Sequence, residues 1–104
     1  MAEDLLRVVL AGEPPSHSAY LREDGAVVVE WYDLAADRPY ESANMLIFDE
    51  TAQRALAGQL DLPDASGPDA LVRAIGARFK SYWEVRKFAD DHGLAYQHEV
   101  DFMP

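Results

Sequence analysis

The stretch that decides the fold runs from His17 to Asp33 and reads HSAYLREDGAVVVEWYD. Two segments rich in valine and aromatic residues flank Glu23-Asp24-Gly25. Asp-Gly is typical of a tight hairpin turn, because glycine adopts a positive φ without steric cost. Side chains alternate along a strand, so Val27 and Trp31 share one face and Glu30 lies on the other. The sequence therefore predicts a hairpin whose second strand buries the face of Val27.

Further elements are indicated on both sides of this hairpin. A short apolar run with two valines precedes it, and a segment apolar enough to be buried on both faces, predicted to be a central strand, follows a polar loop. Later segments repeat apolar residues at helical spacing, and the last segment alternates apolar and polar residues with one predicted wet face. The predicted strands are His17–Arg22, Ala26–Asp33, Ala43–Phe48 and Ala95–Phe102, and the predicted helices are Glu50–Leu60, about Ser66–Phe79, and Ser81–His92. The run Leu5–Leu10 is too short to separate strand from helix by periodicity, and its two β-branched valines favour a strand.

Polar residues stand where these helices begin. Asp49 is placed to cap the first helix, and Ser66 is placed to cap the second, with Pro68 in its first turn. Ser81 and Glu84 have the spacing of a capping box, in which each side chain accepts a hydrogen bond from the other residue's backbone N–H. The helices thus carry local start signals that are independent of their apolar patterns.

The order of these elements predicts an α+β fold. An antiparallel or mixed sheet of about four to five strands is covered on one face by about three helices, because strands and helices are segregated along the chain. At 104 residues and 49% hydrophobic content, we expect a single compact domain over residues 1–104. The N-terminal residues lack the pattern of a signal peptide, and no segment has the roughly 20 apolar residues of a spanning helix. A cytoplasmic protein without membrane contact is predicted.

Several chemistries lack their residues in this sequence. There is no cysteine, which excludes disulfides and thiolate metal sites. Glycine-rich phosphate loops are absent, so no nucleotide cofactor is expected. The three histidines, His17, His92 and His98, share no metal-ligand spacing. His92 and His98 fall on apolar faces and are predicted to be buried, and the serines beside His17 are too common a pattern to indicate a nucleophile.

Charge divides the chain into two parts. Residues 1–72 carry fourteen acids and four arginines, whereas residues 73–104 carry equal numbers of acids and bases and sum to zero. Within the second part, residues 73–87 hold five cations, one acid, Tyr82 and Trp83. Nucleic acid is disfavoured by the net charge of -10, and a basic protein partner is favoured.

The leading hypothesis from the sequence is a small acidic protein-binding module, for example an inhibitor or immunity-type antagonist of a basic partner. No motif favours an enzyme. We predict acidic contacts on the loop after the hairpin and a second patch on the last helix, where Trp83 is expected to lie outside the core. The acidic contacts are Glu30, Asp33, Asp37, Tyr40 and Glu41, and the second patch is Trp83, Arg86 and Lys87.

Three other interpretations remain open at this stage. The cations of the last helix have acids four residues later and are equally well explained as surface pairs, Arg86 with Asp90 and Lys87 with Asp91. A ligand-binding domain or small enzyme would place a pocket between sheet and helices, lined by Trp31, Tyr96 and His98. A structural subunit would form a homodimer through an apolar sheet face or a sheet edge.

Overall fold

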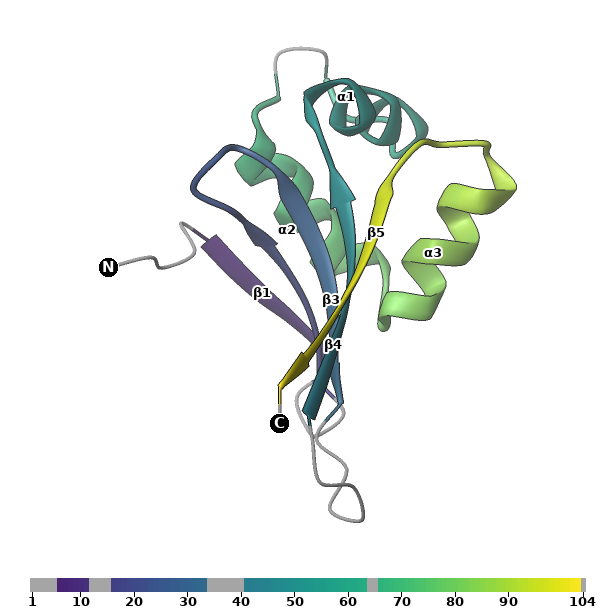
Figure 1. Ribbon diagram of the computed structural model, residues 1–104. Helices are drawn as coiled ribbons and strands as arrows, with labels where there is room; N and C mark the ends of the chain where they lie inside the picture. Colours follow the sequence, from purple (N-terminus) through teal and green to yellow (C-terminus); the bar gives the residue numbers. More distant parts are fainter. Residues whose placement is uncertain (1–5, 12–15, 34–40, 64–65, 104) are drawn as a thin grey trace.

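A five-stranded antiparallel sheet in sequential order β1-β2-β3-β4-β5 forms the body of the molecule, and three helices lie between β4 and β5 in the chain (Figure 1). The structure is a computed structural model that describes residues 6–11, 16–33, 41–63 and 66–103. The five-stranded sheet and the three helices confirm the predicted α+β class. The strands are β1 Leu6–Ala11, β2 Ser16–Leu21, β3 Val27–Asp33, β4 Glu41–Phe48 and β5 Gln97–Met103, and the helices are α1 Glu50–Gln59, α2 Pro68–Arg78 and α3 Tyr82–Asp91.

The predicted hairpin is present as β2 and β3. Its turn is closed by backbone hydrogen bonds from Arg22 to Ala26 (2.9 Å) and from Gly25 to Arg22 (3.0 Å). Gly25 has a φ of 90°, where a side chain would be strained. This turn sets the register that places His17 opposite Trp31, and the same alternation continues across β4 and β5.

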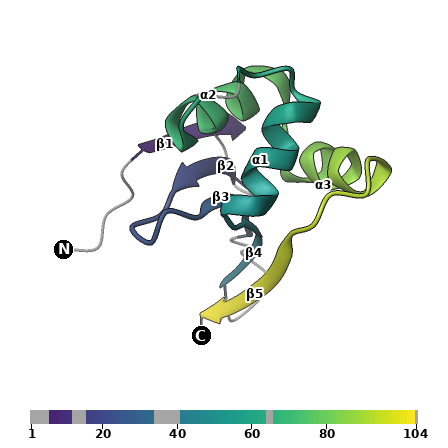
Figure 2. The same ribbon diagram turned by 90° about the horizontal axis from the view of Figure 1, so that it is seen from above.

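All three helices cover the same side of the sheet, which we call the inner face (Figure 2). The main core joins this face to the helices, and Val27 and Val29 are fully buried in it, as predicted. The opposite side, which we call the outer face, carries a smaller cluster made by Tyr20, Ala26, Val28 and Ile47. No helix among the described residues is long and apolar enough to cross a membrane.

Helix α2 crosses β1 at very short range. A Cβ atom at Gly76 would lie 2.3 Å from Val8 Cγ1, well inside van der Waals contact. Glycine therefore fits this crossing, since the side chain of a larger residue would force Val8 or α2 to shift. The close approach lets α2 cover the inner side of β1, where Leu6 and Val8 pack against the core.

Two of the predicted helix caps are confirmed, and two details of the capping predictions are wrong. Asp49 accepts from the backbone N–H of Ala52 (2.9 Å), and Ser81 accepts from that of Glu84 (3.1 Å), as predicted. Ser66 does not cap α2; Gly67 occupies the N-cap and offers no side-chain bond. Glu84 accepts from the N–H of Lys80 (2.8 Å), one residue before its expected partner, so the capping box is shifted by one position.

Two predictions about the strands are wrong: which strand is central, and how much of the last strand is buried. The buried strand β4 starts at Glu41 and neighbours the edge strand, so β3 is the central strand. Strand β5 was expected to have one wet face, yet Gln97 to Asp101 are all exposed. His98 and His92 are exposed as well, because β5 is an edge strand and His92 lies at the C-cap of α3.

Candidate functional site

The outer face of the sheet is organised in cross-strand rows. Register places Ser18, Glu30, Met45 and Glu99 side by side across β2 to β5, and the next row holds Ser16, Tyr32, Ala43 and Asp101. Cross-strand neighbours on one face lie about 4.5–5.5 Å apart, so these side chains form one surface. Three acids, Glu30, Glu99 and Asp101, therefore lie on the face that the helices leave uncovered.

Glu30 is already engaged by a cation of its own sheet. Arg7 donates to Ser18 Oγ (2.6 Å), approaches Glu30 Oε1 (3.4 Å), and lies 4.2 Å from the centre of the Tyr20 ring. The Glu30 side chain is 17% exposed. This predicted contact residue thus supports the β1 side of the outer face and offers a partner little of its carboxylate.

Glu99 and Asp101 differ from Glu30 in being exposed. Both are exposed in β5, and neither side chain forms an ion pair or hydrogen bond with another residue that the structure describes. The nearby cation Arg22 is occupied by Asp24, to which it donates two hydrogen bonds of 3.0 and 2.7 Å. That pairing raises the pKa of Arg22 and lowers the pKa of Asp24 to about 2. Glu99 attracts the Arg22 guanidinium more weakly than Asp24 does, and it is among the smaller causes of the raised pKa of Arg22. The β5 side of the outer face therefore carries negative charge that no ion pair among the described residues neutralises.

The other predicted acidic contacts are placed less completely. Asp33 ends β3 opposite Ser42, and Glu41 begins β4 opposite Met103, so their backbones lie at the same end of the sheet as Asp101. Asp37 and Tyr40 lie outside the described residues. Sequence reasoning missed Glu99 and Asp101, although their alternation with His98 and Val100 was visible, because it did not treat the last strand as an edge.

The second predicted patch lies beside the inner face, away from the acids. Trp83 is 49% exposed, and its ring lies 5.1 Å from that of Trp31 and 4.9 Å from that of Tyr82. Because Trp31 and Glu30 point to opposite sides of β3, one flat partner surface cannot contact both patches. The two predicted patches are therefore separate features of the molecule.

The cations of α3 are held by groups near them. Lys87 pairs with Asp91 (2.8 Å), as the surface-pair interpretation predicted, and this hydrogen bond raises the pKa of Lys87. Asp90 instead accepts from the Tyr96 hydroxyl (2.7 Å), which raises the pKa of Tyr96. Arg86 lies beside the Tyr82 and Tyr96 hydroxyls, and the attraction between these groups outweighs its desolvation and raises its pKa.

The rings of Trp31, Tyr82 and Trp83 pack against one another, and we call this group the aromatic corner. Two polar atoms in it lack hydrogen-bond partners. Trp31 Nε1 and the Tyr82 hydroxyl are buried without a hydrogen bond. Burial raises the pKa of Tyr82, and the neighbouring Arg86 guanidinium offsets part of that rise without adopting hydrogen-bond geometry. Such atoms cost free energy. Both belong to residues packed in the core, Tyr82 being fully buried, so the corner acts as structural packing in this conformation.

Among the histidines, His17 has a structural role that the sequence did not predict. It is buried, stacks near Trp31 with ring centres 6.4 Å apart, and its Nδ1 accepts the backbone N–H of Tyr82 (2.9 Å). The first N–H groups of a helix have no partner within the helix. His17 supplies one for α3 and so joins the second strand to the last helix. The sequence contained one signal for its burial, which is the alternation of His17 with the apolar residues Ala19 and Leu21.

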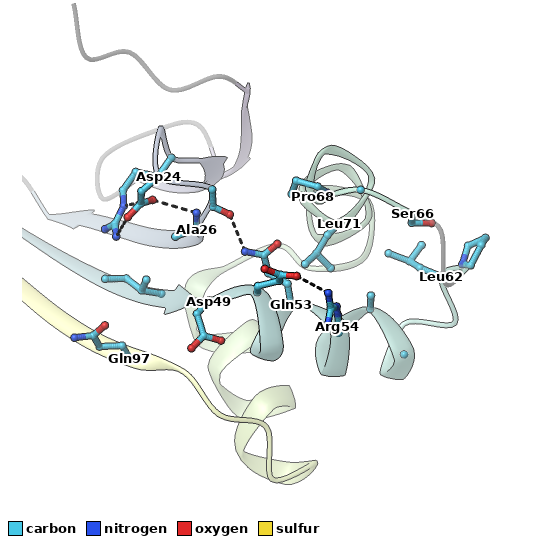
Figure 3. A pocket seen from close by; sticks show the side chains of 18 residues that line it. Asp24, Ala26, Asp49, Gln53, Arg54, Leu62, Ser66, Pro68, Leu71 and Gln97 are labelled. Atoms are coloured by element: carbon cyan, nitrogen blue, oxygen red, sulfur yellow. Dashed lines mark hydrogen bonds and ion pairs between the residues drawn. The ribbon is translucent and has the colours of Figure 1, made fainter.

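A cleft of about 770 Å³ opens between the β2–β3 turn, α1 and the start of α2 (Figure 3). Its charged side chains and Gln53 already bond to one another or to backbone: Asp24 with Arg22, Glu50 with Arg54, Asp49 with the Ala52 N–H, and Gln53 with the Gly25 and Phe48 carbonyls. Trp31, Tyr96 and His98 do not line it, so a pocket made by these three stays a prediction. Across the described ranges, no three acids or histidines gather as metal ligands would.

The acids and cations of the two chain halves stay apart. Within the part of the chain that the structure describes, no ion pair joins a cation of residues 73–87 to an acid of residues 6–72. The comparisons were made with protein-family models, curated proteins and solved structures, and none of them matches this chain.

Proposed function

We propose that the protein is a small binding module whose acidic outer face engages a basic protein partner, as an inhibitor or immunity-type antagonist would. The observation that carries this proposal is the helix-free side of the sheet, on which the exposed Glu99 and Asp101 form no ion pair with a described residue. A cationic surface would supply the missing counterions.

Electrostatics favours this use of the outer face over a purely solvating role. The net charge of -10 attracts cationic surfaces from a distance and accelerates their encounter. The cations of residues 73–87 do not cancel that field through pairs with the acidic part. With no cysteine to oxidise, the protein is suited to a reducing compartment, and we place it in the cytoplasm.

The experiment is affinity capture from the native host at low and high salt, followed by identification of the retained proteins. We compare the natural chain with a triple variant, Glu99→Lys, Asp101→Lys and Glu41→Lys, which reverses the two acids that carry the proposal and the predicted contact that begins β4 at the same end of the sheet. A triple variant on the helices, Glu50→Lys, Asp69→Lys and Asp91→Lys, changes the net charge equally and serves as the control. We expect a basic protein that is retained at low salt, released at high salt, and lost only with the first variant.

One outcome would remove the proposal. If the retained proteins resist salt and bind all three chains equally, acidic recognition by this face is wrong. Loss of binding with both triple variants would equally contradict it, because net charge alone would then account for capture.

A further inference from the structure

Strand β5 ends the sheet, and its far edge pairs with no other strand among the described residues. An edge strand presents unpaired backbone N–H and C=O groups that can bind another strand. Proteins commonly protect such edges with proline, lysine or a bulge. Gln97–Met103 contains neither residue, and its pairing with β4 runs without a register shift from Ile47 to Glu41. The edge of β5 is therefore regular and accessible.

The two faces of β5 differ in chemistry. Glu99 and Asp101 lie on the outer face, whereas His98 and Val100 lie on the inner face, with Val100 42% exposed. A strand laid along this edge would place alternate side chains beside each pair. Cations would face the two acids, and apolar side chains would face Val100.

The same charges disfavour a second copy of this chain as the occupant. Antiparallel pairing of two β5 strands about Val100 would set Glu99 of one copy opposite Asp101 of the other. Like charges directly opposite each other are destabilising. The other edge of the sheet, β1, carries Arg7 on its outer face and would repel the cations of a basic strand. Of the two edges, only β5 suits a basic segment.

We propose that β5 receives an extended segment of the basic partner as a sixth strand, with lysine or arginine alternating with apolar residues. This inference rests on the proposed function and specifies how the partner binds. Backbone hydrogen bonds along the edge supply affinity, and the alternation of the added side chains supplies specificity. The acids of β5 thus distinguish a basic strand from another copy of the chain.

The probe is a synthetic seven-residue peptide in which lysine and valine alternate. A block peptide of the same composition, with its lysines contiguous, keeps the charge and removes the alternation. Two further peptides carry N-methyl groups on alternate residues, the first on the odd-numbered residues and the second on the even-numbered residues. Each peptide therefore loses its N–H donors along one edge of the added strand and keeps them along the other. Binding is followed by amide hydrogen exchange and by amide NMR shifts of the full chain at low salt.

We expect the alternating peptide to slow exchange at alternate amides of Gln97–Met103 by at least about tenfold, since new edge hydrogen bonds protect them. Binding should fall at least about tenfold for the block peptide, for one of the two N-methylated peptides, and for the variant Glu99→Lys with Asp101→Lys. The variant Glu50→Lys with Asp91→Lys, which has the same net charge, should bind like the natural chain.

Failure of this inference is distinguishable from failure of the proposed function. If peptides bind with charge-dependent affinity but leave the β5 amides unprotected and ignore N-methylation, strand addition is wrong and acidic recognition stands. If the host protein's capture is unaffected by salt and by reversal of Glu41, Glu99 and Asp101, the proposed function itself fails. No protection at β5 with any basic peptide overturns the sixth strand.

Discussion

His17 Nδ1 accepts a buried hydrogen bond from the backbone N–H of Tyr82, 65 residues later in the chain. An imidazole that accepts at Nδ1 must carry its proton on Nε2 and be neutral. Protonation would remove the acceptor and place a positive charge at the positive end of α3. The attachment of α3 to the sheet therefore depends on the charge of one side chain.

A pH dependence of stability follows from this bond. Burial lowers the pKa of His17 below its ordinary value of 6.5. The unfolded chain then binds the proton first, so the free energy of unfolding falls as pH decreases below about 6.5 and levels off below the folded-state pKa. Denaturant unfolding at pH 7.5 and 5.5 measures the change.

Two variants separate the roles of His17. Asparagine retains an acceptor near the position of Nδ1 without titrating, so His17→Asn should flatten the pH dependence. His17→Ala should cost about 1–3 kcal/mol at pH 7.5, because the Tyr82 N–H loses its partner in a buried site. His98→Gln, at an exposed histidine, is the control and should change neither quantity. A full pH dependence in His17→Asn would show that another group is responsible.

The crossing of α2 over β1 makes a second prediction. Gly76→Ala should reduce the free energy of unfolding by about 1–3 kcal/mol, because its Cβ would overlap Val8 Cγ1. Gly58→Ala is the matched control, since its Cβ would meet no atom within 4 Å. In α1 that change should stabilise the protein by about 0.5–1 kcal/mol.

The pair Gly76 and Val8 can also be tested by compensation. Trimming the valine in Val8→Ala should remove most of the added cost of Gly76→Ala, which a double-mutant cycle of unfolding free energies measures. Equal destabilisation by Gly76→Ala with and without Val8→Ala would show that the contact does not determine the spacing of the two elements.

The charges of β5 predict how the chain associates with itself. Replacing Glu99 and Asp101 by threonine removes the like charges and adds residues that favour strands. We expect the double threonine variant to self-associate in sedimentation velocity at concentrations where the natural chain sediments as a monomer. A homodimer of the natural chain whose contacts map to the edge of β5 would contradict this.

Local chemistry explains which parts of the fold were predictable. Asp-Gly determined the hairpin, Asp49 and Ser81 marked two helix starts, and glycine after His92 marked the end of α3 with a φ of 64° at Gly93. Each signal acts over a few neighbouring residues, so the sequence displays it directly.

The failures share a different origin. His17, Glu99 and Asp101 acquire their roles from residues far away or from the order of strands in the sheet. Alternation in β5 correctly predicted a strand, but the burial of His98 depended on whether anything lay beyond that strand. Ser66 had the right chemistry for a cap, but the N-cap is Gly67, one residue beyond it, because Pro68 took the first helical position.

The sequential order of the sheet has a consequence for synthesis on the ribosome. β1 to β4 pair with immediate neighbours and can assemble as each emerges. β5 follows only after the whole helical segment, so the free side of β4 waits for a few seconds at a translation rate of about 5–20 residues per second. During that interval the helices that cover Leu46 and Phe48 are incomplete and the strand beside β4 is missing. The apolar side chains of the nascent chain are then open to chaperone binding or aggregation.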